Sequence, residues 1–181
     1  MKSVRMSWVR WAAVLTASAF LMGSASQAWA EEWRDGWPVV TQMKPGESDA
    51  ANFQVQIAQY LLRAHGFAVK VDPNFGVQSV AAVRRFQRSR GLKATGVLSA
   101  PTWRKLIVTV RQGSRGDAVR AVQLVLHDSP PPQGDSRLPV DGIFGVQTRR
   151  ALEKWQRDVN LKPDGIVGPA TWRKLLFNVA D

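Results

Sequence analysis

Four short segments share a pattern of residue types that is typical of a tight turn followed by the start of a helix. The N-terminus of a helix can bind an anion. Segments 141–148 and 164–171 both follow the template D-G-x-x-G-x-x-T, while 72–79 and 95–102 keep the spacing with other letters. Asp-Gly favours a tight turn, and Gly or Ser suits the residue before a helix. The free N–H groups and dipole of a helix N-terminus attract carboxylates. The segments are therefore candidate anion sites, unless their Asp side chains already cap the helices.

The candidate ligand-binding residues are the polar and glycine positions of these segments, with a Gln from each intervening helix. They are Asp141, Gly142, Gly145, Thr148, Gln156, Asp164, Gly165, Gly168, Thr171, Asp72, Gly76 and Gln87. Four Gln residues stand on or beside apolar helical stripes, where an amide needs a partner: Gln59, Gln87, Gln123 and Gln156. For these we favour a hydrogen bond to the adjacent loop backbone over direct ligand contact.

The elements that must position these residues occur twice. Residues 75–106 and 144–175 align without a gap and are identical at 15 of 32 positions, which indicates two copies of one packing unit. Each copy opens with an i, i+3, i+7 apolar stripe: Val55, Ala58 and Leu62, then Val119, Val122 and Leu126. A middle helix follows, and then a short one carrying Trp103 or Trp172, which we expect in the core. The pattern predicts an all-α chain of two tandem three-helix bundles.

The N-terminal region has the features of an export signal. Basic residues precede an apolar run over 11–22 and a small-x-small site at 28–30, so we expect cleavage after residue 30 and a secreted protein. We expect an N-terminal segment over 31–45, module one over 46–110 and module two over 111–181. Trp33 and Trp37 are expected to pack onto module one. No later segment has the length of a membrane span, which predicts no stable insertion.

The charge is strongly basic and uneven. The chain has 25 Lys and Arg against 14 Asp and Glu, and the excess is concentrated in the first module. Arg84, Arg85 and Arg88 form the densest basic surface expected on a helix. On an exported protein such charge points to an anionic polymer outside the membrane and not to nucleic acid.

The sequence lacks the usual catalytic arrangements. There is no Cys for a nucleophile, and the two His residues, His65 and His127, lack metal-ligand spacing and are expected at the surface. The few Glu residues are not set in a domain that could hold a glycosidase pair. We therefore predict a protein that is not an enzyme and needs no cofactor or metal.

Taken together, the motifs resemble the peptidoglycan-binding type 1 domain, a three-helix module found on many bacterial wall hydrolases. Copy two matches from Val119 to Leu175, and copy one from Val55 to Leu106 with losses at Pro73, Thr95 and Ser99. The resemblance implies non-catalytic binding of wall peptidoglycan, through stem peptide or glycan, by a monomeric wall-associated protein. Two alternatives stay open: a secreted partner or inhibitor of an enzyme such as a wall hydrolase, and a charge-driven binder of anionic wall polymers such as teichoic acids.

Overall fold

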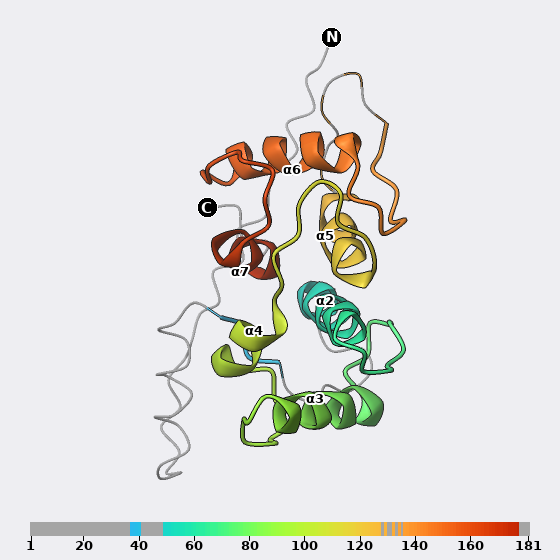
Figure 1. Ribbon diagram of the computed structural model, residues 1–181, viewed down its shortest axis with the longest axis vertical. Helices are drawn as coiled ribbons and strands as arrows, with labels where there is room; N and C mark the ends of the chain where they lie inside the picture. Colours follow the sequence, from blue (N-terminus) through green and yellow to red (C-terminus); the bar gives the residue numbers. More distant parts are fainter. Residues whose placement is uncertain are drawn as a thin grey trace, which may run out of the picture.

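The computed structural model describes residues 37–40, 49–127, 129, 132, 134 and 136–177. Within these residues the protein is all-α, with three isolated antiparallel bridges in place of strands, as the sequence predicts (Figure 1). The helices are α2 (Asp49–Ala64), α3 (Val77–Ser89), α4 (Ala100–Leu106), α5 (Asp117–His127), α6 (Val146–Asp158) and α7 (Pro169–Phe177). The expected export signal lies outside the described residues, and no helix of the described part is long and apolar enough to cross a membrane.

The first helix of each module buries the stripe that the sequence predicts. Val55, Ala58 and Leu62 of α2 have no exposed surface, and the equivalent residues of α5 are at most 2 % exposed. Trp103 and Trp172 are also fully buried. Both tryptophans are therefore part of the core, as expected.

Each of these tryptophans fastens an extended segment that precedes its module. The indole N–H of Trp103 donates to the carbonyl of Pro38 at 2.7 Å, and that of Trp172 to the carbonyl of Val108 at 2.7 Å. Antiparallel bridges join Val40 to Leu98 and Val110 to Val167. We therefore propose that the modules start near residues 37 and 107, earlier than the sequence boundaries at 46 and 111.

The buried Trp37 belongs to this first docked segment. It is 4 % exposed, in agreement with the expectation that it packs onto module one, whereas Trp33 lies outside the described residues.

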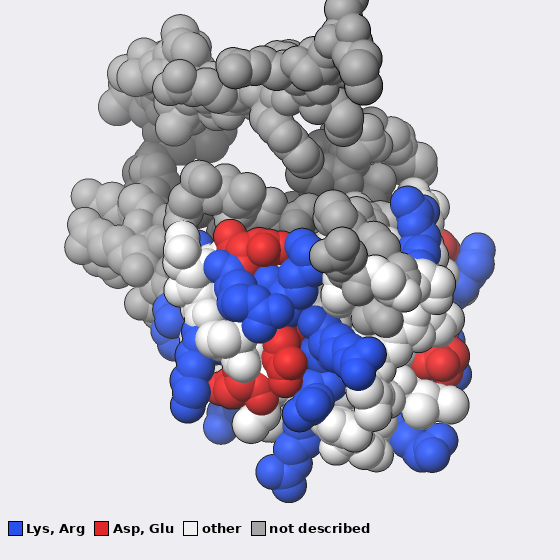
Figure 2. Space-filling view, turned by 90° about the horizontal axis from the view of Figure 1, so that it is seen from above, with Lys and Arg blue, Asp and Glu red and all other residues white. Residues whose placement is uncertain are grey.

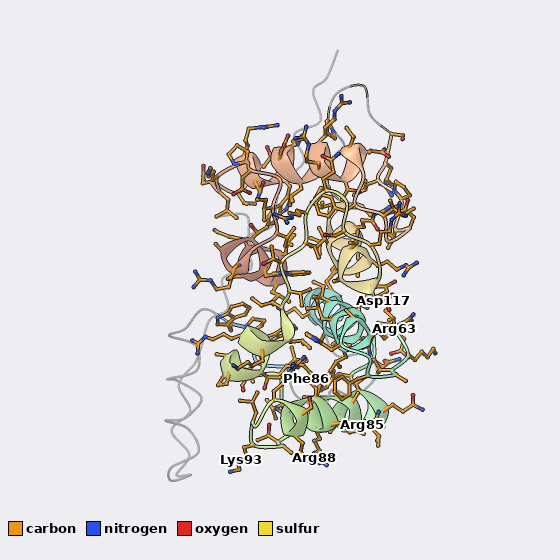
Figure 3. All side chains as sticks on the ribbon, in the orientation of Figure 1. Arg63, Arg85, Phe86, Arg88, Lys93 and Asp117 are labelled. Carbon is orange, nitrogen blue, oxygen red and sulfur yellow. The ribbon has the colours of Figure 1, made fainter. Side chains whose placement is uncertain are left out.

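The two modules share one hydrophobic core. Helix α2 packs most extensively against α5, with α3 at one end of the molecule and α6 at the other (Figure 1). The reason is a second buried stripe, with Ile57 and Leu61 beside the predicted one, and a helix buried on two sides serves two neighbours. The Arg63 guanidinium also pairs with Asp117 at 2.9 Å across the junction (Figure 3).

Candidate functional site

One buried glutamine holds each of the four turns. In module two the side-chain oxygen of Gln123 accepts the Gly142 N–H at 2.7 Å. Its amide donates to the Ile143 carbonyl at 3.1 Å and to the Thr148 hydroxyl at 3.3 Å. The same amide also meets the Asp141 carboxylate at 2.8 Å. One side chain thus fixes both the turn and the start of the following helix.

Gln156 repeats this arrangement on the second turn of module two. Its oxygen accepts the Gly165 N–H at 3.0 Å, and its amide donates to Asp164, to the Ile166 carbonyl and to Thr171. The expectation that these glutamines bond the adjacent loop backbone is therefore confirmed.

The second turn of module one keeps this hydrogen-bond arrangement although its residues differ from the template. Gln87 accepts the Gly96 N–H at 2.9 Å and donates to the Val97 carbonyl and to two threonine hydroxyls, one of them from Thr95. The Thr95 hydroxyl also accepts the Val97 N–H at 3.1 Å, as the carboxylate of Asp164 does for Ile166. Threonine thus replaces aspartate without loss of the turn.

The first turn of module one differs by one register step because Pro73 has no N–H to donate. The oxygen of Gln59 accepts the N–H of Asp72 instead, at 2.8 Å, while its amide still reaches the Asn74 carbonyl and the Ser79 hydroxyl. The substitution of Gly by Pro therefore changes the local bonding and preserves the turn.

The aspartates do not cap the helices, which corrects that part of the sequence interpretation. The Asp72 and Asp164 carboxylates accept the N–H groups of Asn74 and Ile166, which lie in the turns and not in the helices. The Asp141 carboxylate likewise accepts the N–H of Ile143, two residues on, at 2.8 Å. This backbone bond, together with the Gln123 amide, holds the pKa of Asp141 below its usual range.

The structure separates the candidate ligand-binding residues into two groups. The side chains of Gln87, Gln156, Thr148 and Thr171 are at most 5 % exposed, and Gly142 and Gly165 are buried as well. Asp141 and Asp164 are exposed, and Gly145, Gly168, Asp72 and Gly76 are intermediate. The buried group can shape the turns, and only the exposed and intermediate positions are open to contact from outside the fold.

Exposed apolar residues on the same turns are the feature that the sequence analysis missed. The large hydrophobic side chains exposed in the described part of the chain are Val77, Ile143, Val146 and Ile166, at 74 %, 45 %, 49 % and 37 %. Ile143 and Ile166 occupy the third position of the template, and Val77 and Val146 the sixth. The fourth position of the template is buried in all four copies, where it holds Phe75, Leu98, Phe144 and Val167. The turn itself therefore decides which apolar residue is buried and which faces out. Comparison of the four copies could have found this signal.

An open groove lies beside the start of α3. It has a volume of about 320 Å³ and is lined by residues from 69 to 79, including Asn74, Val77 and the exposed Lys70. The groove therefore contains the most exposed apolar residue of the four, next to the uncapped start of a helix.

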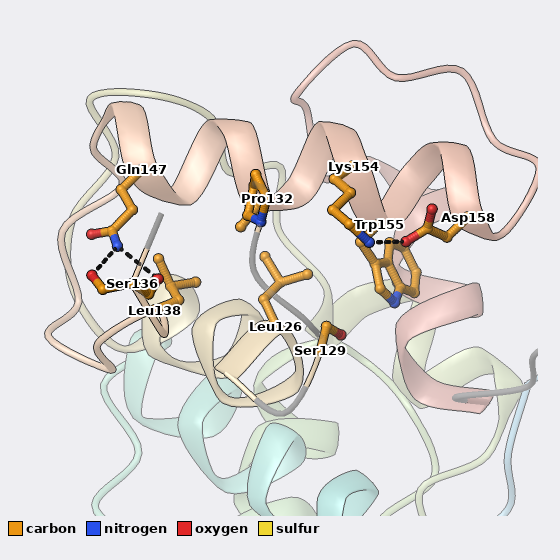
Figure 4. Close-up of a pocket in the computed structure, with 10 residues that line it drawn as sticks. Leu126, Ser129, Pro132, Ser136, Leu138, Gln147, Lys154, Trp155 and Asp158 are labelled. Carbon is orange, nitrogen blue, oxygen red and sulfur yellow. Dashed lines mark hydrogen bonds and ion pairs between the residues drawn. The ribbon is translucent and has the colours of Figure 1, made fainter. Parts of the chain in front are cut away.

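A second pocket, between the end of α5 and α6, is too small for a ligand (Figure 4). Its volume of about 10 Å³ accommodates one water molecule at most. The Gln147 amide bonds to Ser136 at 3.1 Å and 3.2 Å, and Lys154 pairs with Asp158 at 2.7 Å within the same lining.

The predicted basic residues lie on α3, and all three are exposed. Arg88 is on the side of that helix away from α2 (Figure 3), and the Arg85 guanidinium lies 3.5 Å from the Ala68 carbonyl. The Arg84 side chain lies over Gly96, where a Cβ would come within 3.0 Å of its Nε atom. Viewed from the α6 end, by contrast, basic and acidic side chains alternate (Figure 2).

Both histidines are half-buried, contrary to the expectation of surface positions. A ring nitrogen of His65 lies 2.9 Å from the Leu106 carbonyl, and one of His127 lies 2.6 Å from the Leu138 carbonyl. Each ring thus ties the end of a first helix to another part of its module. In the part of the chain that is described, no group of three His, Cys, Asp or Glu residues could hold a metal ion.

These turns and helices define a tandem pair of three-helix modules. The profile of the putative peptidoglycan binding domain matches residues 53–106 and again 115–175. The chain belongs to this family, as its motifs indicate.

Curated relatives carry similar modules. Over 115 residues the chain is 39 % identical to an N-acetylmuramoyl-L-alanine amidase, CwlM, of Mycobacterium tuberculosis, covering 57 % of this chain and 27 % of the amidase. It is 40 % identical over 67 residues to a zinc D-Ala-D-Ala carboxypeptidase of Streptomyces albus G, covering 37 % and 26 %. An uncharacterized protein of Kitasatospora aureofaciens is 50 % identical over 64 residues, covering 35 % and 52 %. The chain therefore spans from about a quarter to about half of the length of these relatives.

Proposed function

We propose that this protein binds peptidoglycan without cleaving it, as an exported protein that stays with the cell wall. The family membership supports peptidoglycan as the ligand. The observation that carries the proposal is the placement of the four exposed apolar side chains on the turns that the family motif builds.

The proposed contact surface consists of the outward positions of the turns, not of the buried motif residues. Val77 and Val146 each start a helix, so a bound chain would meet an apolar side chain beside backbone N–H groups that no side chain caps. The valine side chains can contact sugar rings or stem-peptide methyl groups, and the nearby N–H groups can donate to a carboxylate. This combination suits a ligand that has both apolar groups and carboxylates. Asp141 and Asp164 would contribute to binding by holding the turns in shape and through the exposed parts of their side chains.

A non-catalytic role is supported by the arrangement of the polar groups. The buried glutamines and threonines are saturated by hydrogen bonds within the fold, and no buried side-chain polar atom of the described residues lacks a partner. A catalytic acid, base or nucleophile needs a free position toward the substrate. The turn residues instead act as a scaffold.

The test is co-sedimentation of the purified chain with peptidoglycan freed of other wall polymers, with assay of released sugar and peptide. We expect binding without release. Val77→Ser and Val146→Ser should each weaken binding about fivefold, because burying most of a valine contributes roughly 1 kcal/mol. The matched control is Ala81→Ser, an exposed position on α3 outside the groove lining.

Each other outcome has a definite meaning. Release of wall fragments by pure protein contradicts the non-catalytic role. Absence of binding, with inhibition of a secreted hydrolase, would favour the alternative of an enzyme-directed interaction protein. Equal binding by the valine variants and wild type would move the contact surface away from the helix starts.

A further inference from the structure

The outer face of α3 has a charge pattern that the fold does not require. Between Asp72 and Asp117 the chain has nine Lys and Arg residues and no Asp or Glu. Five of them lie within ten positions on and just after α3: Arg84, Arg85, Arg88, Arg90 and Lys93. Arg84 and Arg88 are four residues apart, and like charges at that spacing repel on a helix. The cluster therefore opposes helix stability.

The equivalent helix of module two shows that the scaffold works without this cluster. By the repeat alignment, Arg84 and Arg85 correspond to Glu153 and Lys154 of α6. On α6 the charges are paired, with Glu153 3.6 Å from Arg149 and Lys154 2.7 Å from Asp158. The outer face of α3 has no such acidic residue on the helix itself.

Two of the five cations have local neighbours, and these do not neutralise the surface. The Arg90 guanidinium lies over the Phe86 ring at 5.4 Å and 3.0 Å from a ring nitrogen of His65. Arg85 approaches the Ala68 carbonyl at 3.5 Å. These contacts orient the guanidinium groups and leave their positive charge uncompensated.

We propose that the outer face of α3, from Arg84 to Lys93, is a second binding surface for a phosphate-bearing anionic polymer of the wall. Four of the five cations are arginine, whose planar fork donates two hydrogen bonds to one phosphate. Residues four apart on a helix repeat about every 6 Å, which presents a row of charge to a chain with regularly spaced anions. This surface is distinct from the exposed turn positions. The proposal rests on the proposed function only in that peptidoglycan binding would bring the protein to the wall.

The experiment measures binding of the full chain to inorganic polyphosphate and to poly-L-glutamate of similar length, at low and at physiological salt. We expect preference for polyphosphate and affinity that falls as salt rises, because exposed charges are screened within about 8 Å at physiological ionic strength. The triple variant R84Q/R85Q/R88Q should lose on the order of tenfold in affinity at low salt, and far less at high salt. Its helix is expected to persist, because Gln has a helix propensity similar to that of Arg.

The matched control removes the same number of cations from α6, as R149Q/K154Q/R157Q. It should change polyphosphate affinity by less than about twofold, since Arg149 and Lys154 are paired with Glu153 and Asp158. Equal loss in both triple variants would overturn the proposal, because net charge alone would then explain binding. Equal affinity for poly-L-glutamate would overturn the assignment to phosphate.

A charge exchange between the modules gives an independent check. Glu153 lies over Gly165 as Arg84 lies over Gly96, so Arg84→Glu places a side chain that the same scaffold already accepts. We expect Arg84→Glu to weaken polyphosphate binding about threefold to tenfold, and Glu153→Arg on α6 to change it by less than about twofold. Equal effects of the two substitutions, or no effect of Arg84→Glu, would contradict the proposal. Sedimentation of these variants with phosphate-free peptidoglycan should equal that of the wild type. If the wild type itself does not sediment with peptidoglycan, that result contradicts the proposed function and not the second binding surface.

Discussion

The side-chain oxygen of Gln123 accepts a hydrogen bond from the Gly142 N–H, 19 residues further along the chain, at 2.7 Å. The same relation joins Gln87 to Gly96 and Gln156 to Gly165. A buried amide therefore sets the turn geometry three times over, with Gln59 as a shifted fourth case. The exposed turn positions depend on this internal bond.

Replacing Gln123 by Leu should lower the free energy of unfolding by about 2–4 kcal/mol. The substitution leaves the buried Gly142 N–H without its acceptor, and an unsatisfied buried group costs about 1–3 kcal/mol. Chemical denaturation followed by circular dichroism measures the change. Gln147→Ala is the control, since its bonds to Ser136 are exposed and should contribute less than about 0.5 kcal/mol. Equal effects would contradict the role of Gln123.

Gly142 should tolerate a side chain much less well than Gly145, although both are glycines of one motif. Gly142 has φ +80°, and a Cβ there would lie 2.9 Å from the Arg120 guanidinium carbon, so Gly142→Ala should cost about 1–3 kcal/mol. Gly145 has φ −87° and open space, and Ser99 already occupies the same template position, before a helix, in the second turn of module one. Gly145→Ser should therefore be nearly neutral in thermal unfolding. A reversed order would refute this assignment.

The sequence predicts the helices and the core stripes because both follow from local periodicity. The 3.6-residue spacing of Val119, Val122 and Leu126 is sufficient to place them inside. The spacing of the template likewise places the helix starts at Gly76, Ser99 and Gly145. These features need no knowledge of distant contacts.

The remaining features depend on long-range contacts that spacing alone does not show. The junction of α2 with α5 joins residues such as Arg63 and Asp117, 54 positions apart. The docking of Trp103 on the Pro38 carbonyl spans 65 positions and moves the apparent start of the module. The half-burial of His65 likewise depends on the Leu106 carbonyl. For the candidate site, the residues of the motif predict the turns. Which of these residues face outward depends on burial, which the motif does not show.

The shared core predicts that both modules unfold together. Helices α2 and α5 cover each other, and Gln54 of α2 donates to the Leu176 carbonyl of module two at 2.8 Å. Scanning calorimetry should therefore give one transition with equal calorimetric and van't Hoff enthalpies. Chains of 37–106 or 107–181 alone, which keep the docked segments, should be much less stable, because each exposes the apolar side of its first helix. Two separate transitions in the full chain would show that the modules are independent.

The lowered pKa of Asp141 predicts a specific acid sensitivity. The cause is the Ile143 N–H first and the Gln123 amide second, both of which bond to the ionised carboxylate. A lowered folded-state pKa means that this stabilisation is complete above the usual pKa of Asp, near pH 4, and is lost as the pH falls through the folded value. Asp141→Asn keeps an oxygen to accept both bonds but cannot titrate. The free energy of unfolding of the wild type should therefore fall more steeply below about pH 4 than that of D141N, as measured by urea denaturation at several pH values. Parallel pH profiles for the two proteins would contradict the role assigned to the Asp141 carboxylate.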